Sequence, residues 1–387
     1  MDKSKWEYEK LGEVATFIGG GTPSKTNTDY YSGNIPWATV RDMTSFMLNK
    51  TEYCITEEAV ANSATNIIPQ GTIVISTHVG LGKICELQQD TAINQDLKAV
   101  SFKTALIDKR FFSYWYKSIS DYIISNGKGA TVKGVTLNFI KGLNLPIPSL
   151  SDQNYIVSEL DQLSAIISLK QQQMKEYDAL AQSLFYEMFG DENNQYNGFQ
   201  TFKLSELFEV GTGSTPSRKL ENIYYGGTLN WVKTTEIHGN YISETEEKIT
   251  QKALEDTNCK MYPSNTILIA MYGQGKTRGQ VARLSAPAAT NQACSAILPK
   301  PEIFNTDFLF EFFLLSYERI RNMARGGTQS NLNLSLVKSI EIPLPPLSLQ
   351  RSFAEKVKAI EHQKSLLKQS IAETQTLLDS RMQEYFS

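Results

Sequence analysis

The sequence predicts an α+β fold in which two similar copies of one unit each end in a long helix. The first observation is a duplication: residues 140–156 (IKGLNLPIPSLSDQNYI) return as residues 337–353 (VKSIEIPLPPLSLQRSF), displaced by 197 positions. The second is an apolar seam at heptad spacing after each of these segments. A chain of 387 residues suits two to three domains of ordinary size, so two copies fit its length.

The duplication covers most of the chain. Framework segments pair in order, and their displacement drifts only from 193 to 197. They are KLGEVATF (10–17) with KLSELFEV (203–210), GTPS (21–24) with STPS (214–217), YYSGNIPW (30–37) with YYGGTLNW (224–231), PQGTIVIS (69–76) with PSNTILIA (263–270), GLGK (80–83) with GQGK (273–276), and INQD (93–96) with TNQA (290–293). A few loop insertions explain the drift.

The first part of each copy is typical of mixed strands and helices. Short β-branched runs at Thr72–Thr77 and Thr266–Ala270 are bounded by Pro, Gly and Asn turn signals. Helical patterns follow at Lys109–Tyr122 and Thr306–Met323. The aromatic residues of these two helices are expected in the core or on a surface that faces a partner.

The second part of each copy is a predicted helix of about 35 residues, which spans roughly 50 Å at 1.5 Å per residue. Its apolar positions step alternately by four and three, as in a coiled coil. The seam residues are Ile156, Leu160, Leu163, Ile167, Met174 and Leu184 in the first copy, and Phe353, Val357, Ile360, Leu367, Ile371 and Leu378 in the second. Ser151 and Ser348 are the predicted N-caps. We expect the two helices to pair; the alternative is a helix packed against its own domain.

Composition narrows the class of protein. The net charge of −3 argues against a general polyanion binder, and residues 151–200 hold eight acidic and two basic side chains, so any nucleic-acid face is local. That acidic helix is either a solvated face or a surface that repels phosphate and contacts partners. No apolar stretch or leader pattern is found, and a cytoplasmic protein is expected. The four cysteines and three histidines are too scattered for a zinc site, so buried reduced thiols are expected.

No catalytic motif stands out in the sequence. Residues 273–277 (GQGKT) resemble the end of a phosphate-binding loop, but Ala270 stands where that motif needs its first glycine. Zinc-protease and dinucleotide-binding patterns are missing too, and the histidines are too few for a convincing triad. The sequence therefore favours a scaffold or a reader over an enzyme.

Two α+β copies that end in a proline-punctuated strand and a long helix, with GTPS, a Trp after Tyr-Tyr and a mid-domain Asn-Gln, resemble the specificity subunits of type I restriction-modification systems. The resemblance covers essentially the whole chain. It implies target recognition domains at residues 1–150 and 198–347, a central spacer helix with its exit linker at 151–197, and a C-terminal spacer helix at 348–387. The helices would form an antiparallel coiled coil with pseudo-two-fold symmetry.

The resemblance also implies a function. A specificity subunit has no catalytic activity, metal or cofactor of its own. It reads a bipartite, asymmetric target in double-stranded DNA and recruits two adenine-N6 modification subunits, and the restriction subunits through them. S-adenosylmethionine, ATP and Mg are expected in those partners. Two readers suit half-sites about one helical turn, roughly 34 Å, apart.

The candidate DNA-contacting residues are polar side chains that interrupt the shared framework, because such groups read base edges or hold phosphates. They are Thr39, Arg41, His78, Lys83, Lys128, Lys133, Lys233, Thr234, Thr235, Tyr272, Lys276, Arg278, Arg325 and Gln329. Those after the shared tryptophans are alternatively plain solvent-facing positions. Those beside the glycine turns at 80–82 and 273–275 are alternatively parts of ordinary hairpins.

Positions that both copies keep are expected to be framework rather than readout. They include the shared Trp37, Asp42 with its counterpart Glu236, and the Asn-Gln pairs at 94–95 and 291–292. An alternative function is a duplicated protein-interaction scaffold without DNA recognition. Binding that weakens steeply with salt favours the DNA reader, whereas salt-insensitive association with protein alone favours the scaffold. A nucleotide hydrolase would need an intact phosphate loop.

Overall fold

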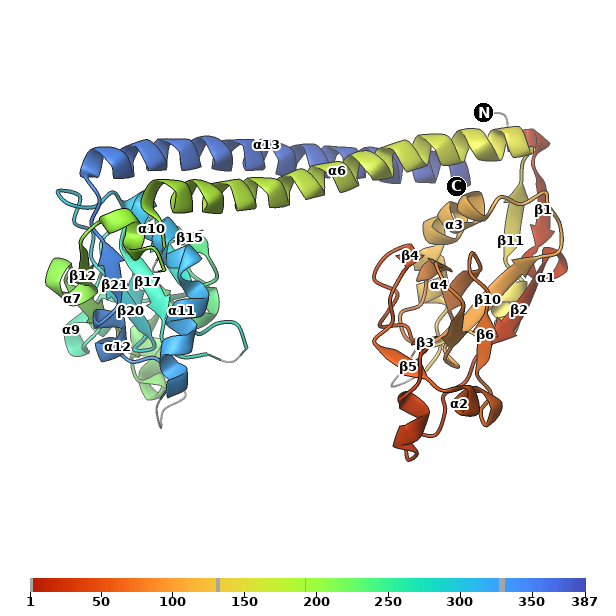
Figure 1. Cartoon of the computed structure of the whole chain (residues 1–387), viewed down its shortest axis with the longest axis horizontal. Helices are drawn as coiled ribbons and strands as arrows, with labels where there is room; N and C mark the ends of the chain where they lie inside the picture. The colour runs from red at the N-terminus through yellow and green to blue at the C-terminus, as the bar shows by residue number, and fades with distance from the viewer. Residues whose placement is uncertain (1–2, 130–132, 192, 274, 327–330) are drawn as a thin grey trace. The chain divides into compact units, whose positions relative to one another are not determined.

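The computed structural model describes residues 3–129, 133–191, 193–273, 275–326 and 331–387. The chain divides into two compact units. Unit 1 comprises Met1–Gln171 and Gln369–Ser387, and unit 2 comprises Gln172–Lys368. Both units are mixed α+β, as the sequence predicts (Figure 1). Each unit thus consists of one α+β domain and one half of each long helix.

The described residues of unit 1 form three sheets. Its strands are β1 (Glu7–Lys10), β2 (Ala15–Gly19), β3 (Ile35–Ala38), β4 (Met47–Leu48), β5 (Tyr53–Ile55), β6 (Asn66–Ile68), β7 (Ile73–Ser76), β8 (Ile84–Leu87), β9 (Thr91–Ile93), β10 (Leu97–Phe102) and β11 (Asn144–Ile147). The main sheet has the order β2-β10-β7-β8-β4, a second sheet has the order β5-β3-β9-β6, and β1 pairs with β11.

Unit 2 repeats this strand order, except that its described residues form no counterpart of β6. Its strands are β12 (Thr201–Lys203), β13 (Val210–Thr212), β14 (Tyr225–Val232), β15 (Asn240–Ile242), β16 (Glu247–Ile249), β17 (Ile267–Ala270), β18 (Val281–Leu284), β19 (Ala289–Thr290), β20 (Cys294–Ile297) and β21 (Glu341–Pro343). The sheets are β13-β20-β17-β18-β15, β16-β14-β19 and β12-β21. The duplicated sequence therefore folds into a duplicated topology.

Each predicted domain helix is broken into two. In unit 1, α3 (Lys109–Ser118) is followed by α4 (Ser120–Ser125); in unit 2, α10 (Thr306–Leu315) is followed by α11 (Tyr317–Asn322). The residues between them, Ile119 and Ser316, have ψ angles of 11° and 4°, which interrupt the helical ladder. Most of the aromatic side chains of α3 and α10 lie in the cores, as one of the two interpretations expected.

Short helices complete the two domains. They are α1 (Leu11–Val14), α2 (Glu57–Ala61), α5 (Leu137–Lys141), α7 (Leu204–Leu207), α8 (Glu221–Tyr224), α9 (Gln251–Asp256) and α12 (Leu334–Lys338), with 3-10 turns η1 (Lys3–Lys5), η2 (Thr28–Tyr31), η3 (Gln195–Gly198), η4 (Arg218–Leu220), η5 (Thr234–Glu236) and η6 (Met323–Gly326). No helix of the described residues is long and apolar enough to cross a membrane. Three of the cysteines are buried thiols, and burial raises the pKa of Cys85 to about 12.

The long helices α6 (Leu150–Phe189) and α13 (Leu347–Phe386) have 40 residues each, more than predicted. The predicted N-caps are wrong, because both serines lie inside the helices. The hydroxyl of Ser149 accepts a hydrogen bond from the backbone N–H of Asp152 at 3.1 Å, so α6 is capped two residues earlier. Before α13 the carbonyl of Pro346 accepts bonds from the N–H groups of Leu349 and Gln350.

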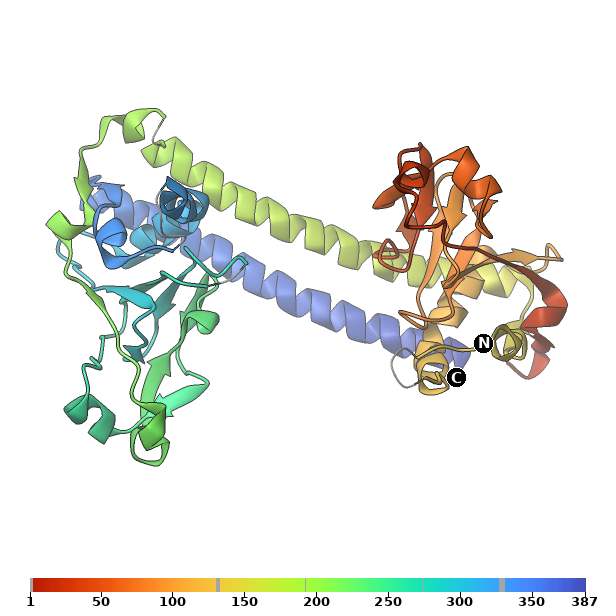
Figure 2. The same cartoon turned by 90° about the horizontal axis from the view of Figure 1, so that it is seen from below.

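The two helices run antiparallel in each unit (Figures 1 and 2). In unit 1 the ammonium of Lys170 donates to the hydroxyls of Ser370 at 2.7 Å and Thr374 at 2.9 Å. Further along, Arg381 pairs with Glu159 at 2.9 Å. Earlier residues of α6 thus meet later residues of α13, which defines the antiparallel sense. A polar group at a seam position fixes the register of paired helices.

In unit 2 the lysine that bonds across the helix pair comes from the other helix. Lys364 of α13 pairs with Asp178 of α6 at 2.7 Å and with Glu361 of its own helix at 2.6 Å. Nearby, the rings of Phe185 and Phe353 pack with centroids 5.6 Å apart. Each unit therefore has a lysine that bonds across the helix pair.

The predicted seam residues lie at different depths. Buried are Ile156, Leu160, Ile167, Phe353, Val357, Ile360 and Leu378, and half-buried are Leu163, Met174, Leu184, Leu367 and Ile371. The helices also pack on their own domains. In unit 1, Ile156 and Leu160 share a cluster with Phe111 and Tyr114 of α3. In unit 2, Phe353 and Val357 belong to the main core.

A buried glutamine joins each domain to its long helix. In unit 1, Gln153 accepts a hydrogen bond from the N–H of Asp108 at 2.8 Å and donates to the carbonyls of Leu106 at 2.7 Å and Pro148 at 2.9 Å. These bonds tie the proline segment and the start of α3 to α6. Because every partner is backbone, any domain sequence that keeps this path can make them.

Gln350 does the same in unit 2. It accepts from the N–H of Asn305 at 2.8 Å and donates to the carbonyls of Ile303 at 3.1 Å and Pro345 at 2.8 Å. Both glutamines have no exposed surface. The repeated proline segment keeps its glutamine because an unpaired amide or carbonyl buried there would be costly.

Candidate nucleic-acid interface

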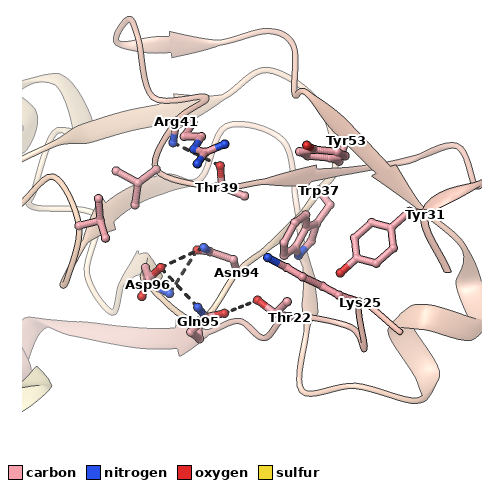
Figure 3. A pocket seen from close by; sticks show the side chains of 12 residues that line it. Thr22, Lys25, Tyr31, Trp37, Thr39, Arg41, Tyr53, Asn94, Gln95 and Asp96 are labelled. Atoms are coloured by element: carbon pink, nitrogen blue, oxygen red, sulfur yellow. Dashed lines mark hydrogen bonds between the residues drawn. The ribbon is translucent and has the colours of Figure 1, made fainter. Parts of the chain in front are cut away.

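A pocket of about 470 Å³ opens in unit 1 beside β3 and β5 (Figure 3). Both strands lie on the side of the domain away from α6 (Figure 1). Three aromatic side chains, Tyr31, Trp37 and Tyr53, form one wall, with ring centroids 5.9 to 6.5 Å apart. The rest is lined by the polar residues Thr22, Lys25, Thr39, Arg41, Asn94, Gln95 and Asp96 and by the apolar residues Val40 and Val79.

The tryptophan is held by the duplicated framework. The indole N–H of Trp37 donates to the carbonyl of Gly21 at 3.2 Å, and the N–H of Gly21 donates to the carbonyl of Ile93 at 3.1 Å. A Cβ at Gly20 would lie 1.9 Å from the carbonyl oxygen of Ile93, so no side chain fits there. This close approach fixes the GTPS segment against the end of β9.

Unit 2 has the same arrangement. The indole of Trp231 donates to the carbonyl of Ser214 at 3.1 Å, and the N–H of Ser214 donates to the carbonyl of Thr290 at 2.9 Å. A Cβ at Gly213 would lie 1.8 Å from that same oxygen. The shared tryptophan is therefore framework, as the sequence predicts.

The Asn-Gln pairs are also framework. In unit 1 the side chain of Asn94 accepts from the N–H of Asp96 at 3.2 Å, and the hydroxyl of Thr22 donates to Gln95. The first bond forms a turn before β10. In unit 2 the counterparts Asn291, Ala293, Thr215 and Gln292 make the same two bonds. What differs is the residue after the pair, which is Asp96 in unit 1 and Ala293 in unit 2.

The loop after β3 places Arg41 at the pocket. The carboxylate of Asp42 accepts from the N–H of Thr39 at 2.7 Å, from its hydroxyl at 2.9 Å and from the N–H of Glu52 at 2.7 Å. Asp42 is thus framework, as predicted, and the Thr39 hydroxyl is engaged inside the loop. Arg41 is exposed and lines the pocket (Figure 3).

The other predicted contact residues of unit 1 gather near this rim. His78 lies 3.7 Å from Asp96, and the Lys83 ammonium lies 3.4 Å from the carbonyl of Val40, which lines the pocket. The backbones of Lys128 and Gly134 exchange two hydrogen bonds of 2.9 Å, and Gly134 packs on the His78 ring. The exposed Lys133 precedes this glycine. Six predicted residues of this domain therefore lie in one region.

The glycine turn at 80–82 has a packing reason. It joins β7 and β8, and both glycines have positive φ angles, 67° at Gly80 and 82° at Gly82. A Cβ at Gly82 would lie 2.8 Å from the Cβ of Ser120. The hairpin interpretation therefore accounts for these glycines without a phosphate.

In unit 2 the side chains of Lys233 and Arg218 form ion pairs next to Trp231, the counterpart of Trp37. Lys233 pairs with Glu246 and Glu247, both at 3.0 Å, and Arg218 pairs with Glu247 at 2.5 Å. Partial burial acts to raise the pKa of Glu247, but hydrogen bonds from Lys233 and Arg218 outweigh it and hold that pKa below its usual value. The predicted contact Lys233 is therefore already engaged within the protein.

The remaining predicted residues of unit 2 lie in two segments. Thr234 and Thr235 form part of η5, directly after Lys233. Tyr272, Lys276 and Arg278 lie in the β17–β18 hairpin, where the hydroxyl of Tyr317 donates to the carbonyl of Lys276 at 2.7 Å. Gln329 lies outside the described residues, and Arg325 is described in its backbone alone.

Sequence reasoning missed part of the pocket. Lys25 follows GTPS, and its counterpart Arg218 follows STPS, so a basic residue at the same place in both copies was the available signal. Tyr53 gave no signal, because it faces Trp37 only through the pairing of β3 with β5. Among the described residues, no group of three or more His, Cys, Asp and Glu side chains could hold a metal ion.

Two similar domains, each with polar loops on a shared framework and one half of each long helix, match the architecture predicted for a DNA specificity subunit. The family described as "Type I restriction modification DNA specificity domain" matches residues 3–177 and 196–375. The chain belongs to this family. It is a specificity subunit with two recognition domains and is itself non-catalytic, as predicted.

Known relatives agree with this assignment. The type I restriction enzyme MjaIX specificity subunit of Methanocaldococcus jannaschii is 23% identical over 388 aligned positions, covering 94% of this chain and 89% of the relative. The S subunit from M. genitalium has a TM-score of 0.55 at 15% identity, covering 99% and 96% of the two chains. A chain from a structure on complex assembly and conformational transition of the type I R-M system has a TM-score of 0.65 at 16% identity, covering 98% and 97%. The two solved structures show that the fold is shared.

Proposed function

We propose that this chain reads a bipartite, asymmetric DNA target, with one half-site for each recognition domain. The observation that carries the proposal is a common framework with different polar side chains. Around the shared tryptophans, Arg41 corresponds to Thr235 and Asp96 corresponds to Ala293. Base edges are distinguished by their donors and acceptors, so two such sites would prefer different bases.

Within each domain we assign readout and positioning to different residues. Arg41 is exposed at the pocket and has the donor geometry for guanine. Lys83, Lys128 and Lys133, at the rim of the same domain, suit phosphate contacts. In unit 2, Thr234, Thr235, Tyr272, Lys276 and Arg278 are proposed contacts, and Lys233 reaches DNA only if its carboxylate partners release it.

We also propose that the helix pair binds two modification subunits, which methylate adenine N6, and brings in the restriction subunits through them. Exposed leucines support two equivalent surfaces. Unit 1 carries Leu169 on α6 and Leu377 on α13, and unit 2 carries their counterparts Leu366 and Leu180, each 47% to 65% exposed. Exposed apolar side chains at equivalent places on the two helices favour a partner surface.

The same proposal assigns the cofactors to the partner subunits. S-adenosylmethionine, ATP and Mg belong to the proposed partners, and this chain supplies recognition. The proposed recognition domains are residues 1–150 and 198–347, and each is followed by a proposed spacer segment, residues 151–197 and 348–387. If the helices set the spacing, their length fixes the number of unread base pairs between half-sites.

The test is a long-read map of N6-methyladenine in a methylation-free host that expresses this chain with its neighbouring modification subunit. We expect a bipartite, asymmetric motif that disappears when this chain is left out. Soluble, associated subunits that produce no motif would instead support the second candidate, a protein-interaction scaffold. Salt dependence separates the two further, since phosphate contacts make DNA binding fall steeply with salt.

A further inference from the structure

We propose that the pocket of unit 1 takes up a single unpaired DNA base, and that the corresponding place in unit 2 is closed by the protein's own Arg218. This inference rests on the proposed function, and goes beyond it by naming the ligand of one pocket. It also predicts that the two half-sites are deformed differently.

The wall of the pocket suits a flat ring. Tyr53 is 43% exposed and stands edge-on to the buried Trp37, with ring centroids 6.5 Å apart, and Tyr31 completes the wall. A base that stacks on an aromatic side chain gains about 1–3 kcal/mol whatever its identity. The volume of about 470 Å³ lies in the range of pockets that bind small molecules.

In unit 2 the corresponding aromatic rings bind a planar side chain of the protein itself. The guanidinium carbon of Arg218 lies 4.1 Å from the ring centroid of Tyr225 and 6.0 Å from that of Trp231. These two rings are the counterparts of Tyr31 and Trp37. A guanidinium is planar and delocalised, so it stacks on aromatic faces as a base does. Glu247 holds it there at 2.5 Å.

Two substitutions between the copies leave the wall of unit 1 open. Tyr53 pairs with Trp37 across β3 and β5 in the same register as Glu247 pairs with Trp231 across β14 and β16. A tyrosine cannot hold a cation as that carboxylate does. Lys25 replaces Arg218, and its ammonium is a point charge without a flat face. The wall of unit 1 therefore remains available to a ligand.

Charge selects a nucleotide over a cationic side chain. The side chains of Lys25 and Arg41 face the pocket together with one carboxylate, Asp96, which is shared with His78 at 3.7 Å (Figure 3). Positive charge attracts the phosphates that flank a base and repels an arginine from a partner protein. The amides of Asn94 and Gln95 supply donors and acceptors for a base edge.

The test measures the cost of unpairing. The complex of this chain with its modification subunits is titrated, by fluorescence anisotropy, with target duplexes that each carry one mismatch, omitting the adenines that become methylated. An extrahelical base costs a few kcal/mol to unpair, and a mismatch lowers that cost. We expect one mismatched position to bind about tenfold tighter, which corresponds to about 1.4 kcal/mol.

Exchanging the corresponding residues of the two units gives two matched double variants. Lys25→Arg with Tyr53→Glu gives unit 1 the residues that close unit 2, and should abolish the tightening at that position. Arg218→Lys with Glu247→Tyr gives unit 2 the residues of the open pocket, and should create a tightening in the other half-site. If one double variant fails to fold, the same titration with the other double variant tests the inference.

Several results would overturn the inference. One is that no mismatch tightens binding, or that the tightening survives in the closed variant, while the matched target is still bound specifically; the proposed function would then stand alone. Another is that the variant Lys25→Arg with Tyr53→Glu no longer binds its modification subunits, while its relative affinities for the mismatched duplexes are unchanged. The pocket would then bind a side chain of a partner protein rather than a base. Absence of any sequence-specific binding would overturn the proposed function itself.

Discussion

Glu311 offers a test of the electrostatics where the second domain meets the helix pair. It lies on α10, and its charged neighbours within unit 2 are Glu361 and Lys364 of α13, Asp178 of α6, and Asp307 of its own helix. Burial, followed by repulsion from Glu361, raises the pKa of Glu311 to about 7, although Lys364 acts in the opposite direction. The substitution Glu311→Gln removes this titration and keeps the shape of the side chain.

The sign and size of the effect on the free energy of unfolding follow from the difference between the folded and unfolded pKa values of Glu311. A carboxyl group whose pKa is raised on folding binds its proton more tightly in the folded state. It therefore weakens folding as pH rises from the ordinary carboxyl value through about 7. Each unit of pKa corresponds to about 1.4 kcal/mol, so a rise from 4.5 to about 7 makes the ionised side chain cost about 3 kcal/mol above pH 8. The glutamine variant should gain that amount at pH 8 and less than about 1 kcal/mol at pH 5.

Thermal unfolding at the two pH values measures the effect. For a domain of this size we expect the unfolding temperature of Glu311→Gln to rise by roughly 5–10 °C at pH 8. Glu318→Gln, at an exposed position on α11, is the control and should change stability by less than about 0.5 kcal/mol. A variant that is less stable than the parent at pH 8 would refute the reasoning, because it would mean that the Lys364 ammonium stabilises the Glu311 carboxylate.

Three further outcomes concern recognition and the join between domain and helix. Arg41→Ala should relax base choice in one half-site, with a loss of about 1–3 kcal/mol of discrimination in a panel of target variants. Lys133→Ala should weaken binding to all sequences alike and reduce the salt slope by about one in the same titrations; equal effects of both variants on every sequence would contradict this division. Gln153→Ala should lower the free energy of unfolding by about 3 kcal/mol, since it strands buried backbone groups, whereas the exposed Gln162→Ala on α6 should be neutral in a denaturant titration.

The repeat made most of the fold predictable. Positions kept in both copies, such as Trp37, Asp42 and the Asn-Gln pair, proved to hold the loops together through backbone hydrogen bonds. These bonds either join residues that are near each other in the sequence or recur at a constant displacement in the second copy. Both features can be recognised in a sequence. The same comparison predicted the helix pair, because the heptad pattern occurs twice.

The rest depends on long-range contacts. Gln153 looks like an ordinary helix residue, yet its partners Leu106 and Asp108 lie 47 and 45 positions earlier. Tyr53 and Trp37 become one wall only through strand pairing. Ser149 and Ser151 are equivalent as cap candidates by composition, and only the path of the chain after the prolines selects the earlier one. Polar contacts were similarly invisible: the sequence offers Lys233 as free, and the fold gives it two carboxylates.

The division of the helices between the units has a consequence for biosynthesis. Unit 2 is one continuous stretch, Gln172–Lys368, whereas unit 1 needs Gln369–Ser387 as well as its own N-terminal residues. In unit 1, Leu378 and Tyr385 complete the cluster around Phe111, and the ring of Phe386 packs on Phe111 at 5.4 Å. Domains generally fold as they leave the ribosome, N-terminal first. Here the domain that is translated first is finished after the one that follows it, so the part of its aromatic surface that α13 covers stays exposed throughout the synthesis of unit 2.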